Sequence, residues 1–391
     1  MHSFISNTDT ATAFNNLVGT IPEEIVALPL LENLNVFANS ITGGLPTSLG
    51  TLTRLIFLDV ERNLLSGPLI ANSLVPLQKL QALRLSRNEF TGSIPTIIGK
   101  WVDLEQFWIS NNRVVGTIPT EIGNLKKLKT SFLYDNSLEG NIPSQMGALT
   151  EMSILRLDGN ILEGRVPEEF FQMTNLEDLR LDGNFLSGTI STHIGRLTGL
   201  GDLRLSENLF TGNIPNQLAE VSNLKNLILF QNYLNSTIPN IFGSYSQMEH
   251  LDVSMNFLTG AIPTSIFALP AVKFVYLSNN SFIGPIPSNF QDPPGLRDLY
   301  LDGNFLSGTI PEVQPGRLQE LNEALFNYNL FQGSVPQSFC NLRLDAVLDD
   351  LFTDCGGEIP EVQCEFPDCC NRCFSGERPP RRAKRTREML R

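Results

Sequence analysis

Arginines and aspartates recur in this sequence at a spacing of 24 residues. The members of this row are Arg156, Asp158, Arg180, Asp182 and Arg204. A guanidinium is a planar fork of donors that fits a carboxylate, so the row predicts recognition of an acidic group. The alternative is that the arginines pair with Asp178 and Asp202 in a cross-strand ion ladder that only solubilises the surface.

Two groups of aromatic residues occupy outward positions of the repeat. The first group is Trp108, Phe132 and Tyr134. The second group is Phe230, Phe274, Tyr276 and Tyr300. Aromatic and Arg side chains are enriched in binding hot spots, and large rings facing water are otherwise unexpected. Rings on a ladder also suit stacking on sugars. These two patches therefore predict binding of a protein, peptide or glycan.

Signatures of catalysis are missing from the sequence. The three histidines, His2, His193 and His250, are scattered, and no HExxH, P-loop or GxSxG motif is present. We therefore expect no enzyme activity, no cofactor and no metal site.

A repeating unit must position these side chains. Asparagines recur at intervals of 24 or 25 residues. They are Asn15, Asn39, Asn63, Asn88, Asn112, Asn136, Asn160, Asn184, Asn208, Asn232, Asn256, Asn280, Asn304 and Asn329. Around each of them the sequence reads LxxLxLxxNxLxGxIPxxLGxL. The LxL step has the period of a strand, and the buried Asn amide can satisfy backbone groups where the chain turns. One unit buries its leucines only against its neighbours, so the pattern predicts a repeat solenoid.

This pattern resembles the plant-type extracellular leucine-rich repeats of receptor-like proteins, receptor kinases and polygalacturonase inhibitors. The resemblance implies an α/β-type, right-handed superhelix. It places a parallel β-sheet on the concave face and loops or 3-10 turns on the convex face. We expect about 13–14 units in residues 14–339, after a frayed or truncated segment at 1–13.

Several units depart from the consensus. Ser131 and Ala324 replace an inward leucine, Ser191 replaces the proline, and Ser236 replaces the glycine. We expect local irregularity at these positions.

All the cysteines lie within residues 340–374. They are Cys340, Cys355, Cys364, Cys369, Cys370 and Cys373. The last unit of a solenoid needs a cap, and disulfides among these residues would supply one in an oxidising compartment. The alternative is a zinc site that includes Cys370 and Cys373. The spacing of the cysteines resembles that in the C-terminal cap of leucine-rich-repeat proteins from diatoms.

Charge and the two ends bear on location. The net charge is −13, although residues 375–391 form a basic tail that we expect to be disordered. An acidic body argues against nucleic acid. The N-terminus lacks a signal peptide and no transmembrane run is present, so we expect a chain truncated upstream, with any membrane anchor in the missing segment. We predict an extracellular or cell-surface protein; the alternative is a cytoplasmic one with reduced cysteines.

These observations favour a non-catalytic, receptor-like ectodomain that binds its ligand on the concave face, with a co-receptor as a further partner. The alternatives are a secreted inhibitor of a cell-wall hydrolase and a structural cell-surface protein. The sequons at Asn235 and Asn279 predict N-glycosylation.

Overall fold

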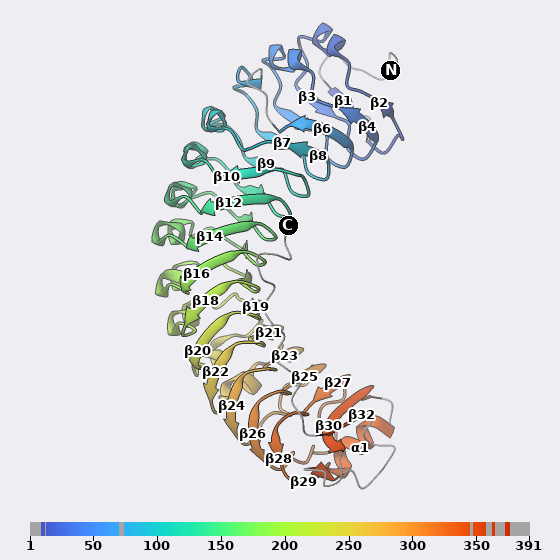
Figure 1. Ribbon diagram of the computed structural model, residues 1–391, viewed down its shortest axis with the longest axis vertical. Helices are drawn as coiled ribbons and strands as arrows, with labels where there is room; N and C mark the ends of the chain where they lie inside the picture. The colour runs from blue at the N-terminus through green and yellow to red at the C-terminus, as the bar shows by residue number, and fades with distance from the viewer. Residues whose placement is uncertain are drawn as a thin grey trace. The chain divides into compact units, whose positions relative to one another are not determined.

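The computed structural model describes residues 9–11, 13–69, 74–344, 347–356, 362–363 and 372–375. The chain divides into two compact units, residues 1–210 and 211–391, where the sequence predicts one uninterrupted solenoid. Both units are built from the same repeat, whose strands stack side by side within each unit (Figure 1).

A parallel sheet of short strands forms one side of each unit, as predicted. In the first unit its strands are β1 (Asp9–Ala11), β3 (Asn33–Asn35), β5 (Phe57–Asp59), β7 (Ala82–Arg84), β9 (Gln106–Trp108), β11 (Thr130–Phe132), β13 (Ile154–Arg156), β15 (Asp178–Arg180) and β17 (Asp202–Arg204). In the second unit they are β19 (Asn226–Ile228), β21 (His250–Asp252), β23 (Phe274–Tyr276), β25 (Asp298–Tyr300), β27 (Glu323–Leu325), β30 (Asp350–Gly356) and β32 (Arg372–Ser375). The middle residue of each three-residue strand from β3 onward points into the core, and its two neighbours face outward. Leu203 is fully buried, for example, while Asp202 and Arg204 remain partly exposed.

A second set of parallel strands follows the repeated asparagines and was not predicted. In the first unit these strands are β2 (Val18–Gly19), β4 (Ser40–Gly43), β6 (Leu64–Pro68), β8 (Glu89–Thr91), β10 (Val115–Thr117), β12 (Ser137–Asn141), β14 (Ile161–Arg165) and β16 (Phe185–Thr189). The later ones are β18 (Leu209–Gly212), β20 (Tyr233–Thr237), β22 (Phe257–Gly260), β24 (Ser281–Gly284), β26 (Phe305–Gly308), β28 (Leu330–Phe331), β29 (Gly333–Ser334) and β31 (Val362–Gln363). Most of them contain the glycine of the LxG step, as Gly140 does at φ +72°.

Short 3-10 helices complete most units, as the resemblance implies. They are η1 (Glu23–Ala27), η2 (Thr47–Thr51), η4 (Thr96–Lys100), η5 (Thr120–Asn124), η6 (Ser144–Ala148), η7 (Glu168–Gln172), η8 (Thr192–Arg196), η9 (Asn216–Glu220), η10 (Phe242–Ser244) and η11 (Thr264–Ala268). A proline such as Pro143, with φ −69°, precedes most of them and fixes the entry of the chain. At η8 the predicted irregularity has a compensation, because the Ser191 hydroxyl accepts a hydrogen bond from the His193 amide.

The repeated asparagines bind the backbone as predicted. Asn160 Nδ2 donates to the carbonyls of Leu133 and Leu157, both at 3.0 Å, and to that of Asp158 at 3.2 Å. Its Oδ1 accepts from the Leu138 amide at 2.9 Å. One buried amide therefore satisfies backbone groups in its own unit and in the preceding one, which pins the register between them.

Two of the predicted irregular positions carry measurable defects. Ser131 is fully buried beside Phe107 on the neighbouring strand, and its hydroxyl has no hydrogen-bond partner among the described residues. Ser236 adopts φ +104°, a backbone conformation that residues other than glycine seldom adopt.

The two ends of the repeat array extend further than the sequence indicates. Strand β1 lies within the segment predicted to be frayed and pairs in parallel with β3. At the other end, α1 (Gln337–Leu344) places Phe339 against Phe290 and Phe326, with ring centroids 6.1 and 5.5 Å away. Strands β30 and β32 then continue the parallel sheet through the segment predicted as a cap.

Cys340 on α1 is almost fully buried and disulfide-bonded. The side chains of Cys355, Cys364, Cys369, Cys370 and Cys373 lie outside the described residues, as does the basic tail. Within the part of the chain that the structure describes, no helix is long and apolar enough to cross a bilayer, and no group of three His, Cys, Asp or Glu side chains could hold a metal ion.

Candidate binding surface on the outward strand face

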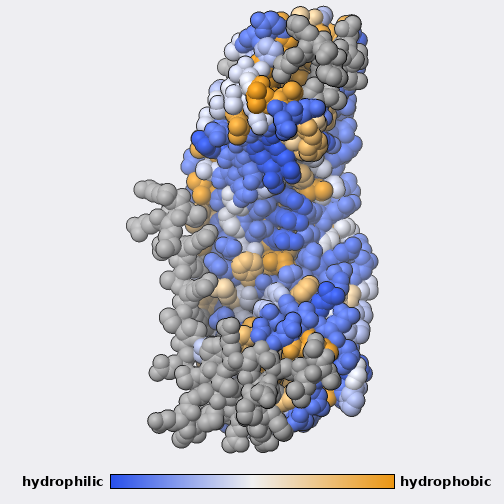
Figure 2. Space-filling model, turned by 90° about the vertical axis from the view of Figure 1, so that its right-hand side faces the viewer, coloured by the Kyte–Doolittle hydropathy of each residue, from blue (hydrophilic) through white to orange (hydrophobic). Residues whose placement is uncertain are grey.

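Parallel register places equivalent outward residues side by side on the strands. We call the two outward positions of each strand, together with the residue two after its end, the strand face. On the first unit Arg84 pairs in register with Trp108, Trp108 with Phe132, and Phe132 with Arg156. Arg156, Arg180 and then Arg204 continue the row. Figure 2 shows a largely hydrophilic surface interrupted by hydrophobic patches, as this composition implies.

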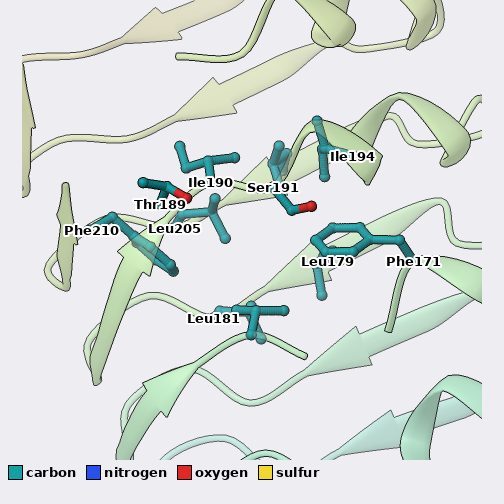
Figure 3. Close-up of a pocket in the computed structure, with 11 residues that line it drawn as sticks. Phe171, Leu179, Leu181, Thr189, Ile190, Ser191, Ile194, Leu205 and Phe210 are labelled. Carbon is teal, nitrogen blue, oxygen red and sulfur yellow. The ribbon is translucent and has the colours of Figure 1, made fainter. Parts of the chain in front are cut away.

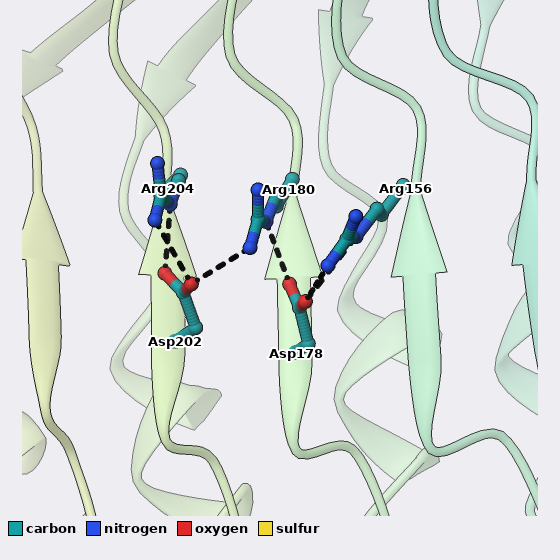
Figure 4. A network of polar contacts seen from close by, with 5 residues as sticks. All are labelled: Arg156, Asp178, Arg180, Asp202 and Arg204. Carbon is teal, nitrogen blue, oxygen red and sulfur yellow. Dashed lines mark hydrogen bonds and ion pairs between the residues drawn. The ribbon is translucent and has the colours of Figure 1, made fainter.

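The predicted arginines form the cross-strand ion ladder that was the alternative to ligand binding (Figure 4). Arg156 Nη2 lies 2.6 Å from Asp178, and Arg180 bonds Asp178 and Asp202, both at 3.0 Å. Arg204 closes the ladder through Asp202 at 2.9 Å. Every guanidinium therefore has a carboxylate partner within the protein, so an acidic ligand would have to compete for these arginines.

The first aromatic group is a stack rather than a set of freely exposed rings. Trp108 and Phe132 are half-buried with centroids 4.7 Å apart, and Phe132 lies 6.3 Å from Tyr134. The indole nitrogen of Trp108 donates to Thr130 Oγ1 at 2.8 Å, which fixes the ring orientation. The group therefore forms an apolar surface with fixed ring orientations beside the ion ladder.

Guanidinium groups lie on both sides of this stack. Arg84 is 4.0 Å from the Trp108 ring centroid and 5.0 Å from that of Phe57, while Arg156 is 5.4 Å from that of Phe132. Gln106 Oε1 accepts from Arg84 Nη2 at 2.6 Å and holds it in place. The rings of the first aromatic group are thus already in contact with cations of the protein itself.

Asp158 and Asp182 occupy the edge of the strand face and are more buried than the sequence indicates. The Oδ1 atom of each is buried and has no hydrogen-bond partner among the described residues. Burial raises the pKa of Asp158 to about 7, and the nearby Asp182 charge acts in the same direction. Burial also raises the pKa of Asp182. The charged forms of these two carboxylates are therefore electrostatically costly.

Three of the four residues of the second aromatic group come together. Tyr276 and Tyr300 stack with centroids 4.4 Å apart, and Phe274 lies 6.3 Å from Tyr276. His250 joins them, edge-on to Tyr276 at 5.2 Å. Phe230 makes no ring contact with this group among the described residues, because it follows β19, and β21 lies between β19 and β23.

Several residues of the strand face were missed at the sequence level. Phe57, Gln106 and Thr130 support the first aromatic group, and Asp298 and Glu323 border the second. All five are the first residue of their strands. The period-2 alternation that puts the third residue outward puts the first outward too, so the signal was present.

The interior void in the described part of the chain is small, and His193 is engaged by a carboxylate. The void drawn in Figure 3, lined by Leu179, Leu205, Phe210 and other core side chains, has about 20 Å³ of space, enough for one water molecule. His193 Nδ1 lies 2.5 Å from Glu168 Oε2, and the Ser191 hydroxyl also donates to this carboxylate. The serine is therefore not oriented by the imidazole as a nucleophile would be. His2 lies outside the described residues.

The two sequons differ in their surroundings. Asn235 is exposed beside a polar hollow of about 400 Å³ that Ser236 and Thr237 also line. Asn279 is exposed next to the strand face, and its neighbour Asn280 is one of the buried repeat asparagines. Asn235 has the more open surroundings for a glycan.

Comparison with known proteins agrees with this architecture. The Leucine Rich Repeat family model matches residues 79–101, 103–125, 175–197 and 271–292. Receptor-like protein 31 of Arabidopsis thaliana is 32% identical over 92 residues, which are 24% of this chain and 11% of that protein. Receptor-like protein 34 of the same organism is 37% identical over 95 residues, 24% of this chain and 10% of that protein. The matches thus span a small part of these relatives.

Solved structures resemble the chain over most of its length. The structure of PEPR1–AtPEP1 superposes with a TM-score of 0.77 and 30% identity, covering 91% of this chain and 52% of that one. The plant peptide hormone receptor RGFR1 in complex with RGF2 gives a TM-score of 0.66 and 27% identity, covering 88% and 66%.

Proposed function

We propose that this leucine-rich-repeat chain is the ligand-binding part of a receptor-like protein, and that its strand face binds a peptide or a protein segment. The observation that carries the proposal is the row of aromatic and charged side chains along parallel strands. An extended peptide can lie across such a row and contact several strands at once. Similarity to peptide-hormone receptor ectodomains supports the same role.

A location outside the cell or at its surface fits this role, and one observation on the chain itself supports it. Cys340 is disulfide-bonded, and disulfides persist in oxidising compartments. We extend this proposal to a disulfide cap that contains all six cysteines and to a glycan on Asn235. A co-receptor as second partner is supported by the HAESA complex with the peptide hormone IDA and the co-receptor SERK1, which has the same fold.

A random peptide library displayed on phage tests the proposal with the purified full chain as bait. We expect enriched peptides whose affinity falls at least about tenfold on Trp108→Ala, because this substitution removes a central aromatic contact. Val115→Ala is the matched control: Val115 is exposed on the second set of strands, away from the strand face. Enriched peptides that bind equally to Trp108→Ala, Arg156→Ala and Tyr276→Ala would contradict the proposal.

A further inference from the structure

The two aromatic groups of the strand face have the same strand geometry but opposite charges beside them. In the first unit Arg84, Trp108 and Phe132 are register neighbours on β7, β9 and β11. In the second unit the corresponding neighbours are Asp252, Tyr276 and Tyr300 on β21, β23 and β25. A carboxylate therefore stands where the first group has its cation.

Hydrogen bonds direct two more carboxylates toward the tyrosine stack. The Tyr276 hydroxyl donates to Asp298 Oδ2 at 2.7 Å, and the Tyr300 hydroxyl donates to Glu323 Oε2. Each bond crosses to the next strand, so the stack and its carboxylates form one connected network. Asp298 and Glu323 are both half-buried. The two hydrogen bonds thus fix the tyrosine side chains beside negatively charged carboxylates.

These carboxylates form no salt bridge among the described residues, although the more distant Arg297 guanidinium acts on Asp298. No ion pair involves Asp252, Asp298 or Glu323 in that part of the chain. Lys273 and Arg297, which directly precede β23 and β25, are paired elsewhere: Lys273 with Glu249 at 2.7 Å, and Arg297 with Glu320 at 3.1 Å. No cation–π contact involves Tyr276 or Tyr300 among the described residues, whereas Arg84 and Arg156 contact the first group.

Burial makes the charged forms of Asp252 and Asp298 electrostatically costly. Burial raises the pKa of Asp298 and the charge of Glu323 acts in the same direction, while the Tyr276 hydrogen bond and the Arg297 charge lower it. Burial also raises the pKa of Asp252. A cation placed here would lower the cost of these charges and would also face aromatic rings, whose quadrupole attracts positive charge.

We propose that the tyrosine stack of Tyr276 and Tyr300, with Asp252, Asp298 and Glu323, is a subsite for a basic side chain, Arg or Lys, of a bound peptide. The inference rests on the proposed function, because it names the chemistry of one part of the ligand. A neutral sugar could stack on the same rings and donate hydroxyl hydrogen bonds, but it would not neutralise the negative charge of the three carboxylates. A cation satisfies both features.

Matched peptides on the full chain test the subsite by calorimetric titration. The probes are acetyl-Gly-Arg-Gly-amide and its citrulline counterpart, which has nearly the same shape without the charge, and cellobiose serves as a sugar probe. We expect binding of the arginine peptide, at least about tenfold weaker binding of the citrulline peptide, and no measurable binding of cellobiose. Higher salt weakens the arginine peptide selectively, because screening reduces attraction between charges.

Two variants localise the effect. Asp298→Asn removes the charge while its amide oxygen still accepts from Tyr276, and we expect a loss of at least about fivefold in affinity for the arginine peptide. Asp292→Asn makes the same change at an exposed aspartate outside the strand face and leaves binding unchanged. Thermal melting of both variants separates lost binding from lost folding.

The outcomes separate the subsite from the general function. Equal binding of the arginine and citrulline peptides, a preference for cellobiose, or equal effects of the two variants would overturn the subsite. The proposed function would survive each of these results if library peptides still depended on the strand face. It fails separately, by the library experiment, if no selected peptide depends on that face.

Discussion

The Arg84 guanidinium lies 4.0 Å from the ring centroid of Trp108, between that ring and Phe57. Through this contact, the first aromatic group already has a cation against its tryptophan ring. It also explains why the two aromatic groups of the strand face, which look alike in sequence, differ in what they can still bind.

Arg84→Gln should destabilise the protein by about 1–3 kcal/mol, because it removes the cation beside two rings, its bond to Gln106 and its ion pair at 3.4 Å with the buried Asp59. Urea unfolding measures the change. Arg54→Gln is the control, since Arg54 forms only an exposed pair with Glu32 at 3.7 Å, and its cost should stay within about 0.5 kcal/mol. Equal costs for the two variants would refute a stabilising stack.

Asn160→Ala should cost about 2–4 kcal/mol, because three carbonyls and the Leu138 amide lose their buried partner. Hydrogen exchange should accelerate most at the Leu138 amide. Asn213→Ala, at an exposed asparagine outside the repeated column, should be near neutral. Unchanged exchange at Leu138 would mean that the asparagine does not hold the register.

Ser236→Gly should stabilise the protein by roughly 1 kcal/mol, because glycine adopts φ +104° without strain. The Asn-x-Thr sequon at Asn235 survives the change, so glycosylation is not altered. The reverse substitution, Gly212→Ser at φ +78°, is the matched control and should destabilise. Thermal melting checks both; a destabilised Ser236→Gly would show that Ser236 is not strained.

Asp158 should make stability depend on pH between about 4 and 7. Its pKa in the folded state, about 7, exceeds the ordinary value near 4, so the folded protein holds the proton more tightly. Stability is therefore greatest below the unfolded pKa and is lost as pH rises through about 7. Asp158→Asn should remove this pH dependence. The free energy of unfolding of the variant minus that of the wild type should be at least about 1 kcal/mol larger at pH 8 than at pH 5.

Urea unfolding at the two pH values measures that difference. Glu139→Gln, an exposed carboxylate on β12, is the control and should show none. A wild-type protein whose stability profile between pH 4 and 7 matches that of Asp158→Asn would rule out the assignment to Asp158.

Much of the fold follows from the spacing of a few residues. The 24-residue interval predicted parallel strands, and the Asn160 bonds confirm the role expected of the repeated asparagine. The second set of strands was missed because most of them have one inward residue, such as Leu138, followed by a glycine two positions later. That pattern is too short to distinguish a strand from a turn.

The strand face was harder to predict than the fold because side chains on it contact each other. Sequence spacing placed Trp108 and Phe132 side by side but could not show that Arg84 would cover one ring. It grouped Phe230 with Tyr276, although the two sit at different positions relative to their strands. The alternation already placed Asp298 and Glu323 outward, but it could not show that each accepts a hydrogen bond from a tyrosine on the preceding strand.

The bonds of Asn160 reach only its own unit and the one before it, and the same pattern recurs at Asn184. If a gene rearrangement removed or duplicated one 24-residue unit, each remaining asparagine would still meet the same backbone groups in its own unit and in the one before it. Residues 181–190 and 301–310 are identical in sequence, so the array already contains interchangeable segments. Such changes would shuffle the outward residues as whole strands, so new ligand surfaces could evolve by recombination while the core stays intact.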